Sequence, residues 1–149
     1  SACRAKQPLI INAARGGVVD EQALLAAIDH KHVKGAIIDT WEHEPQIDQR
    51  LLEKAIFATP HIAGYSADGK TNGTRMSLQA VAEFFGLDIA FNILPPALPD
   101  NYRYNPFEQP VCEQLRRYDP LVDSMSLKKY PMLFEQLRGN YPLRRECSF

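Results

Sequence analysis

Three short apolar runs alternate with two helix-like segments over the first 60 residues of the chain. The runs start near Leu9, Ala36 and Ile56, and each is long enough for one strand. Apolar residues recur at helical spacing between them, namely Leu24, Ala27 and Ile28 in the first segment and Leu51, Leu52 and Ala55 in the second. Strand, helix, strand, helix, strand in this order predicts an α/β fold with a doubly wound parallel sheet. Unbroken apolar runs also predict strands buried on both faces.

A longer helix is predicted after the third run. Ser66 can cap its start, and Gly86 is typical of a helix end. An apolar row runs along one side of the predicted helix. It contains Met76, Ala80 and Phe84, with Val81 and Phe85 beside them. We expect this row to be part of a packed core rather than a cofactor site.

The composition changes at Leu87, where a proline-rich stretch begins. Residues 87–110 are predicted to form an extended linker. Residues 111–149 are predicted to form a small, mostly helical tail, with helices near 111–118 and 131–139. The predicted organisation is therefore a domain over residues 1–86, the linker, and the tail.

Composition and charge exclude several classes of protein. Of the 149 residues, 45% are apolar and 23% charged, as in a soluble globular protein. The net charge of -1 gives no sign of a nucleic-acid or membrane partner. The three cysteines, Cys3, Cys112 and Cys147, are widely spaced, which favours neither a disulfide framework nor a metal site and fits a cytoplasmic protein.

Polar residues of particular types follow the three predicted strands. Arg15 follows the first, Asp39 and Glu44 the second, and His61 the third. The carboxyl ends of parallel strands meet at one sheet edge, where ligands bind. Oxidation of an alcohol beside a carboxylate needs a base, a cation for the carboxylate, and a group that orients the base. Histidine, arginine and glutamate suit these three tasks in that order.

Plainer interpretations exist for the same residues. Arg15 could cap a loop, Asp39 could cap a turn, and Glu42 competes with Glu44 for the histidine. The Arg144, Arg145 and Glu146 cluster is interpreted as a solvated or interface surface.

Three segments resemble the NAD-dependent D-2-hydroxyacid dehydrogenase family. They are residues 12–20 (NAARGGVVD), 35–45 (GAIIDTWEHEP) and 59–64 (TPHIAG), in the family's order. The resemblance implies that the sheet is the C-terminal half of a doubly wound, Rossmann-like fold and that Arg15, Glu44 and His61 are catalytic. It also implies that NAD contacts a set of small and acidic residues, namely Ala13, Ala14, Arg15, Asp39 and Gly64. The sequence around Tyr65 and the tail are similar to a branch that acts on a phosphorylated hydroxyacid, with Tyr65 on the substrate and the tail as a homodimerisation module.

One departure from the family changes the expectation for the isolated chain. No GxGxxG turn for the cofactor diphosphate occurs in the sequence. We therefore expect the chain to be a piece of a larger enzyme that binds NAD poorly alone, and to pair its open sheet edge with another copy. The alternatives are a dehydrogenase of glycerate, hydroxypyruvate or phosphoglycerate, an NAD-sensing corepressor, and a non-catalytic association module.

Overall fold

The computed structural model of the chain describes residues 7–97 and 119–146, which fall into two compact units. Among the described residues, the first comprises 7–63 and 120–141, and the second 64–97, 119 and 142–146. The predicted division into residues 1–86, a linker over 87–110 and a tail over 111–149 stays a prediction. Leu127 and Phe134, which lie in residues 120–141, are buried in the same core as the sheet. The predicted helix at 111–118 lies outside the described residues.

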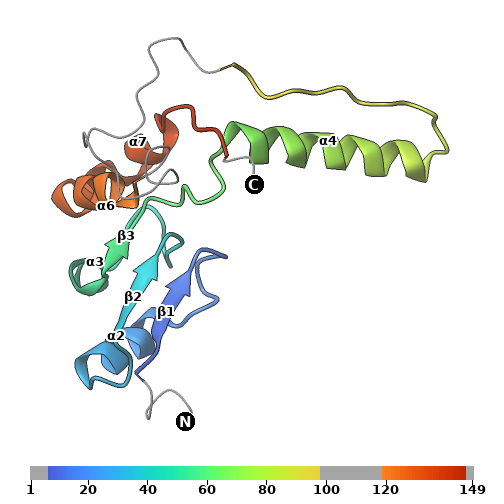
Figure 1. Ribbon diagram of the computed structural model, residues 1–149. Coiled ribbons are helices and arrows are strands. Elements are labelled where there is room, and N and C mark those ends of the chain that lie inside the picture. The colour runs from blue at the N-terminus through green and yellow to red at the C-terminus, as the bar shows by residue number, and fades with distance from the viewer. Residues whose placement is uncertain (1–6, 98–118, 147–149) are drawn as a thin grey trace. The chain divides into compact units, whose positions relative to one another are not determined.

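A three-stranded parallel sheet forms the centre of the first unit (Figure 1). Its strands β1 (Leu9–Asn12), β2 (Gly35–Ile38) and β3 (Phe57–Ala58) lie in the order β1-β2-β3. Helix α2 (Glu21–Asp29) connects the first two strands and α3 (Gln49–Lys54) the second and third. The predicted α/β class and parallel sheet are thus confirmed.

The two faces of the sheet differ in burial, which corrects the expectation for the first strand. Side chains alternate between faces along a strand. Ile10 pairs with buried Ala36 and Asn12 with buried Ile38, so these residues share the covered face. Ile11 lies on the other face and is 64% exposed. The described helices of this unit therefore cover one face, and β1 is not buried on both sides.

Both connecting helices begin at an aspartate that accepts hydrogen bonds from the first turn. Asp20 accepts from the backbone N–H of Ala23, and Asp48 accepts from those of Arg50 and Leu51. The Arg50 guanidinium beside Asp48 holds the pKa of that carboxyl well below its usual range. The caps fix where each helix starts and so which residues face the sheet.

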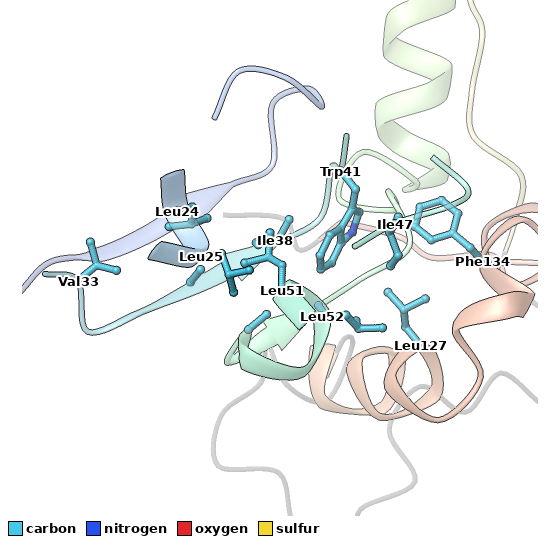
Figure 2. Packing of buried hydrophobic residues seen from close by; sticks show 13 residues of the cluster. Leu24, Leu25, Val33, Ile38, Trp41, Ile47, Leu51, Leu52, Leu127 and Phe134 are labelled. Carbon is cyan, nitrogen blue, oxygen red and sulfur yellow. The ribbon is translucent and has the colours of Figure 1, made fainter. Parts of the chain in front are cut away.

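The core of the first unit combines side chains from the sheet, its helices and the tail (Figure 2). Its members are buried apolar residues, namely Leu24, Leu25, Val33, Ala36, Ile38, Trp41, Ile47, Leu51, Leu52, Ala55, Ala58, Leu127 and Phe134. Burial of this kind supplies the main driving force for folding.

The tail contains three helical elements, α6 (Pro120–Lys129), the 3-10 turn η1 (Pro131–Leu133) and α7 (Phe134–Gly139). Of these, α6 packs on the free edge of β3. The predicted helix at 131–139 corresponds to η1 and α7, whereas α6 was not predicted. The Oγ of Ser124 in α6 accepts a hydrogen bond of 3.0 Å from the N–H of Ala58. A side chain thus takes the place that a fourth strand would occupy at this position.

Replacing Ser124 with alanine is expected to lower the free energy of unfolding by about 1–3 kcal/mol, because the buried N–H of Ala58 loses its acceptor. Ser126→Ala is the matched control, since the Oγ of Ser126 bonds to the carbonyl of Val122 within its own helix. That variant should stay within about 0.5 kcal/mol of the parent. Denaturant unfolding followed by circular dichroism measures both. Equal losses would mean that Ser124 does not cap the sheet edge.

Helix α4 (Ala67–Phe84) is the principal element of the second unit. Ser66 caps it by accepting from the N–H of Gly69, as predicted. The apolar row predicted to be core is instead exposed, and Phe84 is 83% exposed. The physical reason is that α4 is the only helix among the described residues of its unit, so no second helix covers the row.

The segment after Tyr141 docks on the first turn of α4. The N–H of Ala67 donates to the carbonyl of Arg144, and Arg145 forms a two-nitrogen ion pair with Asp68, at 2.8 and 2.9 Å. The guanidinium lowers the pKa of the Asp68 carboxyl. Glu146 accepts a hydrogen bond from Ser66. The cluster at 144–146, interpreted above as solvated or interface surface, therefore holds the helix start, and Arg144 is buried.

None of the helices in residues 7–97 and 119–146 has both the length and the apolar character needed to cross a membrane.

Candidate active site

His61 and Glu44 come together beyond the carboxyl ends of β2 and β3. The Nδ1 of His61 lies 2.9 Å from Oε2 and 3.1 Å from Oε1 of Glu44. Both side chains are largely but not fully enclosed, with 23% and 17% of their surfaces exposed. The pair is thus held within the protein and still reachable from solvent.

The partner of Nδ1 fixes the chemical state of the other ring nitrogen. An ionised carboxylate accepts hydrogen bonds and cannot donate one. The Nδ1 of His61 must therefore carry the proton that bonds to Glu44. In the neutral ring Nε2 then has a free lone pair, which is the form that a general base needs.

The backbone of His61 is held in an unusual conformation. Its φ of 56° lies in the left-handed region, which costs a residue other than glycine about 1–2 kcal/mol. The N–H of His61 donates to the carbonyl of Asp39 at 2.8 Å. Such a conformation persists only where the surroundings hold it, and it is enriched at functional sites.

Asp39 supplies much of that restraint through its side chain. Its carboxylate accepts from the hydroxyl of Thr59 at 2.6 Å and from the N–H groups of Ile62 and Ala63 at 2.8 and 3.0 Å. Asp39 is only 5% exposed. Sequence reasoning assigned it to the cofactor and missed this contact with the histidine loop. Cofactor binding by Asp39 stays a prediction.

Trp41 touches both the glutamate and the histidine loop. Its backbone N–H donates to Oε1 of Glu44 at 2.8 Å, and its indole Nε1–H donates to the carbonyl of Thr59 at 3.0 Å. The side chain is 2% exposed and belongs to the apolar core. Sequence reasoning did not single out Trp41, and no pattern in the sequence marks it beyond its place between Asp39 and Glu44.

The loop that carries Arg15 is organised by Asn12 at the end of β1. The Nδ2 of Asn12 donates to the carbonyls of Thr40 and Arg15, and its Oδ1 accepts from the N–H of Ala14. The Arg15 side chain is exposed and bonds to the adjacent carbonyl of Ala14. Among the described residues no hydrogen bond or ion pair joins Arg15 to Glu44 or His61. Most of its five N–H donors are not bonded to any residue that the structure describes and can bind a ligand.

The structure also shows which of the two candidate glutamates, Glu42 or Glu44, contacts His61. Glu44 contacts His61, whereas the N–H of Glu42 donates to Oε1 of Glu21 at 2.7 Å. Burial raises the pKa of the Glu21 carboxyl. Glu21 is therefore a further residue that holds the acidic loop in place.

The remaining predicted ligand residues fall in two places. Ala13 and Ala14 are exposed directly after β1. Gly64 and Tyr65 begin the second unit, where the ammonium of Lys70 lies 3.8 Å from the centre of the Tyr65 ring. A cation at this distance interacts favourably with the aromatic face.

Comparison with known proteins identifies relatives of this chain. Residues 3–63 match the family model "D-isomer specific 2-hydroxyacid dehydrogenase, NAD binding domain". An erythronate-4-phosphate dehydrogenase of Bacteroides thetaiotaomicron is 50% identical over 95% of the chain and 40% of its own length. Those of Porphyromonas gingivalis and Escherichia coli are 45% and 39% identical over 99% and 94% of the chain. The chain thus spans about 40% of the length of such relatives.

Solved structures give a weaker likeness. A D-isomer specific 2-hydroxyacid dehydrogenase described as putative, from Polaromonas sp. JS6 66, is 28% identical with a TM-score of 0.46, covering 59% of this chain and 28% of that one. A glyoxylate reductase from Paecilomyes thermophila is 29% identical with a TM-score of 0.43, covering 58% and 26%.

Proposed function

We propose that this chain supplies the acid–base site of an erythronate-4-phosphate dehydrogenase. The chain is a homologue of enzymes of that name, and its residues 3–63 match the NAD-binding domain of the D-isomer specific 2-hydroxyacid dehydrogenases. The proposed reaction oxidises 4-phospho-D-erythronate to its 2-oxo acid with NAD, within pyridoxal 5'-phosphate biosynthesis. The observation that carries this proposal is the contact between Nδ1 of His61 and the carboxylate of Glu44.

The pair matches the proton transfer that the reaction requires. In the proposed step, Nε2 of His61 accepts the proton of the C2 hydroxyl as C2 becomes a carbonyl. The carboxylate of Glu44 stabilises the imidazolium that results, through a charge-assisted hydrogen bond. The exposed guanidinium of Arg15 would bind the substrate carboxylate with two parallel hydrogen bonds.

Residues after β1 fit the nicotinamide end of NAD. When bound, NAD accepts the hydride that leaves C2. Ala13, Ala14 and Arg15 follow a parallel strand at the edge where dinucleotides bind, and the two alanines are small and exposed. No glycine turn for the diphosphate occurs among the 149 residues. The proposal therefore assigns the nicotinamide end to this chain, with Asp39 and Gly64 as further predicted contacts.

Tyr65 is the proposed contact for the substrate. The neighbouring Lys70 places a positive charge over its ring, which is the charge that a phosphorylated substrate would favour.

A homodimer is also proposed, because β1 pairs with β2 alone among the described strands and Ile11 is exposed beside that edge. A cytoplasmic location is proposed from the three scattered cysteines.

A chimaera tests the proposed activity. In it, this chain replaces the matching 141 residues of the Bacteroides thetaiotaomicron relative. Formation of NADH is measured with 4-phospho-D-erythronate, D-glycerate and 3-phospho-D-glycerate as rival substrates. The proposal predicts the highest kcat/KM for 4-phospho-D-erythronate. A folded chimaera that prefers another acid, or oxidises none, would contradict it.

The 149-residue chain alone provides the second arm of the test. It should form no NADH and should not enhance NADH fluorescence, because the diphosphate has no glycine turn to rest on. Clear dehydrogenase activity of the isolated chain would show that the site is complete within it and that this division of the cofactor site is wrong.

A further inference from the structure

We propose that Trp41 is the positioning residue of the catalytic pair. It holds the side chains of His61 and Glu44 in place relative to each other through two hydrogen bonds, one from its backbone and one from its indole ring. The inference rests on the proposed function, because the pair has to be catalytic for its position to matter. It adds a residue that the motif resemblance did not mark.

The contacts form a closed ring that begins and ends at Trp41. The backbone N–H of Trp41 donates to Oε1 of Glu44, and the carboxylate of Glu44 accepts from Nδ1 of His61. The chain then runs back through one residue, Pro60, to Thr59. The carbonyl of Thr59 accepts from the indole Nε1–H of Trp41. Each group in the ring is thus held by two neighbours.

Within this closed set of contacts, the hydrogen bond from the indole is the one that no other residue type at this position can supply in the same geometry. Tryptophan carries a single N–H donor on a large apolar ring, and a buried donor needs a partner. Trp41 is 2% exposed, so water cannot easily replace the carbonyl of Thr59. The contact also holds Thr59 two residues before His61, whose backbone is in the left-handed region.

Asp39 holds the opposite side of the same loop, which makes the role of Trp41 separable. The Asp39 carboxylate binds the hydroxyl of Thr59 and the N–H groups of Ile62 and Ala63. It therefore maintains the loop if the indole contact is lost. We expect the loop to remain folded in that case while the ring of His61 gains freedom relative to Glu44.

The test compares variants that retain an apolar ring at residue 41 but lose the donor. Trp41→Phe is the first. The second is the chain grown with benzothienylalanine in place of tryptophan, which exchanges the indole N–H for sulfur and keeps the shape. Because Trp41 is the only tryptophan of the sequence, this exchange is specific to one site. It provides a folded sample if the phenylalanine variant does not fold.

Nitrogen NMR of His61 in the 149-residue chain gives a readout that is independent of activity. The parent should show the tautomer with the proton on Nδ1, and both altered chains should show a larger share of the Nε2–H tautomer. Phe134→Leu is the matched control, because Phe134 is a fully buried aromatic residue of the same core outside the ring of contacts. An unchanged tautomer ratio in both altered chains, or an equal change in the control, would overturn the proposal.

Kinetics of the chimaera supply the functional readout. Trp41→Phe should lower kcat about tenfold, since small misplacements of a catalytic group are costly. KM should stay within about twofold, because the substrate contacts are intact. An unchanged kcat per folded enzyme would contradict the role of Trp41. An inactive parent chimaera would contradict the proposed function instead, and the NMR comparison would then decide on Trp41 alone.

Discussion

The His61→Asn variant of the chimaera should lose about a thousandfold in kcat, within the range of 10²–10⁴ that general acid–base catalysis contributes. Asparagine can still donate a hydrogen bond to Glu44 and is tolerated in the left-handed backbone region that His61 occupies. It cannot accept the proton of the substrate hydroxyl. The loss therefore reports on proton transfer more than on folding.

His43→Asn is the matched control for this prediction. His43 has a φ of 57°, almost the same as the 56° of His61, and its side chain is exposed. The substitution therefore has the same backbone demand without touching the pair. It should leave kcat within about twofold of the parent, because the exposed His43 side chain makes no hydrogen bond to Glu44 or His61 in the described part of the chain. Comparable losses in the two variants would point to backbone strain and not to base catalysis.

Replacing Gly16 with alanine should disrupt the contact between the arginine loop and the acidic loop. An added Cβ would clash with the carbonyl oxygen of Trp41 and lie 2.7 Å from its carbonyl carbon. Both are backbone atoms, so one of the loops has to move. We expect a loss of about 1–3 kcal/mol in the free energy of unfolding from this overpacking. The kcat/KM of the chimaera should also fall at least about tenfold, because Arg15 and Glu44 shift apart.

Gly17→Ala separates crowding from backbone conformation. Gly17 has a φ of 77° and no neighbouring atom within 4 Å of an added Cβ. Alanine there should cost about 1–2 kcal/mol for its left-handed backbone without displacing Trp41. The kcat/KM per folded enzyme should therefore stay close to that of the parent. Thermal unfolding and steady-state kinetics measure both variants. A Gly16→Ala enzyme as active and stable as the parent would mean that the two loops are not in contact.

The parallel sheet and the meeting of His61 and Glu44 at its edge could both be predicted from the sequence. Apolar runs and helical spacing located β1, α2, β2 and α3, because these elements owe their form to local burial patterns. The rule that parallel strands end at one edge predicted that the residues after β2 and β3 would meet. His61 and Glu44 do meet there.

Other features depended on contacts that a single sequence does not encode. Helix α6 buries Ser124 and Leu127, too few positions to form an apolar stripe. Its place in the fold follows from the edge of β3, which needs an acceptor for the N–H of Ala58. The apolar row on α4 was predicted to be buried because periodicity reports which residues share a face and not whether a partner covers it.

The restraints around His61 were the hardest to predict. Asp39 and Trp41 act through hydrogen bonds to backbone groups of the histidine loop, and these depend on the path of a loop and not on a repeating pattern. Motif resemblance pointed to the residues proposed to react, because the chemistry fixes their types. It did not find the residues that hold them.

The most direct test of the account is the protonation of the two ring nitrogens of His61 in the 149-residue chain. Nitrogen NMR at a pH where the ring is neutral distinguishes the two forms. We expect a proton on Nδ1, bonded to Glu44, and a free lone pair on Nε2. A ring that carries its proton mainly on Nε2 would leave no base to face the substrate and would contradict the proposed role of the pair.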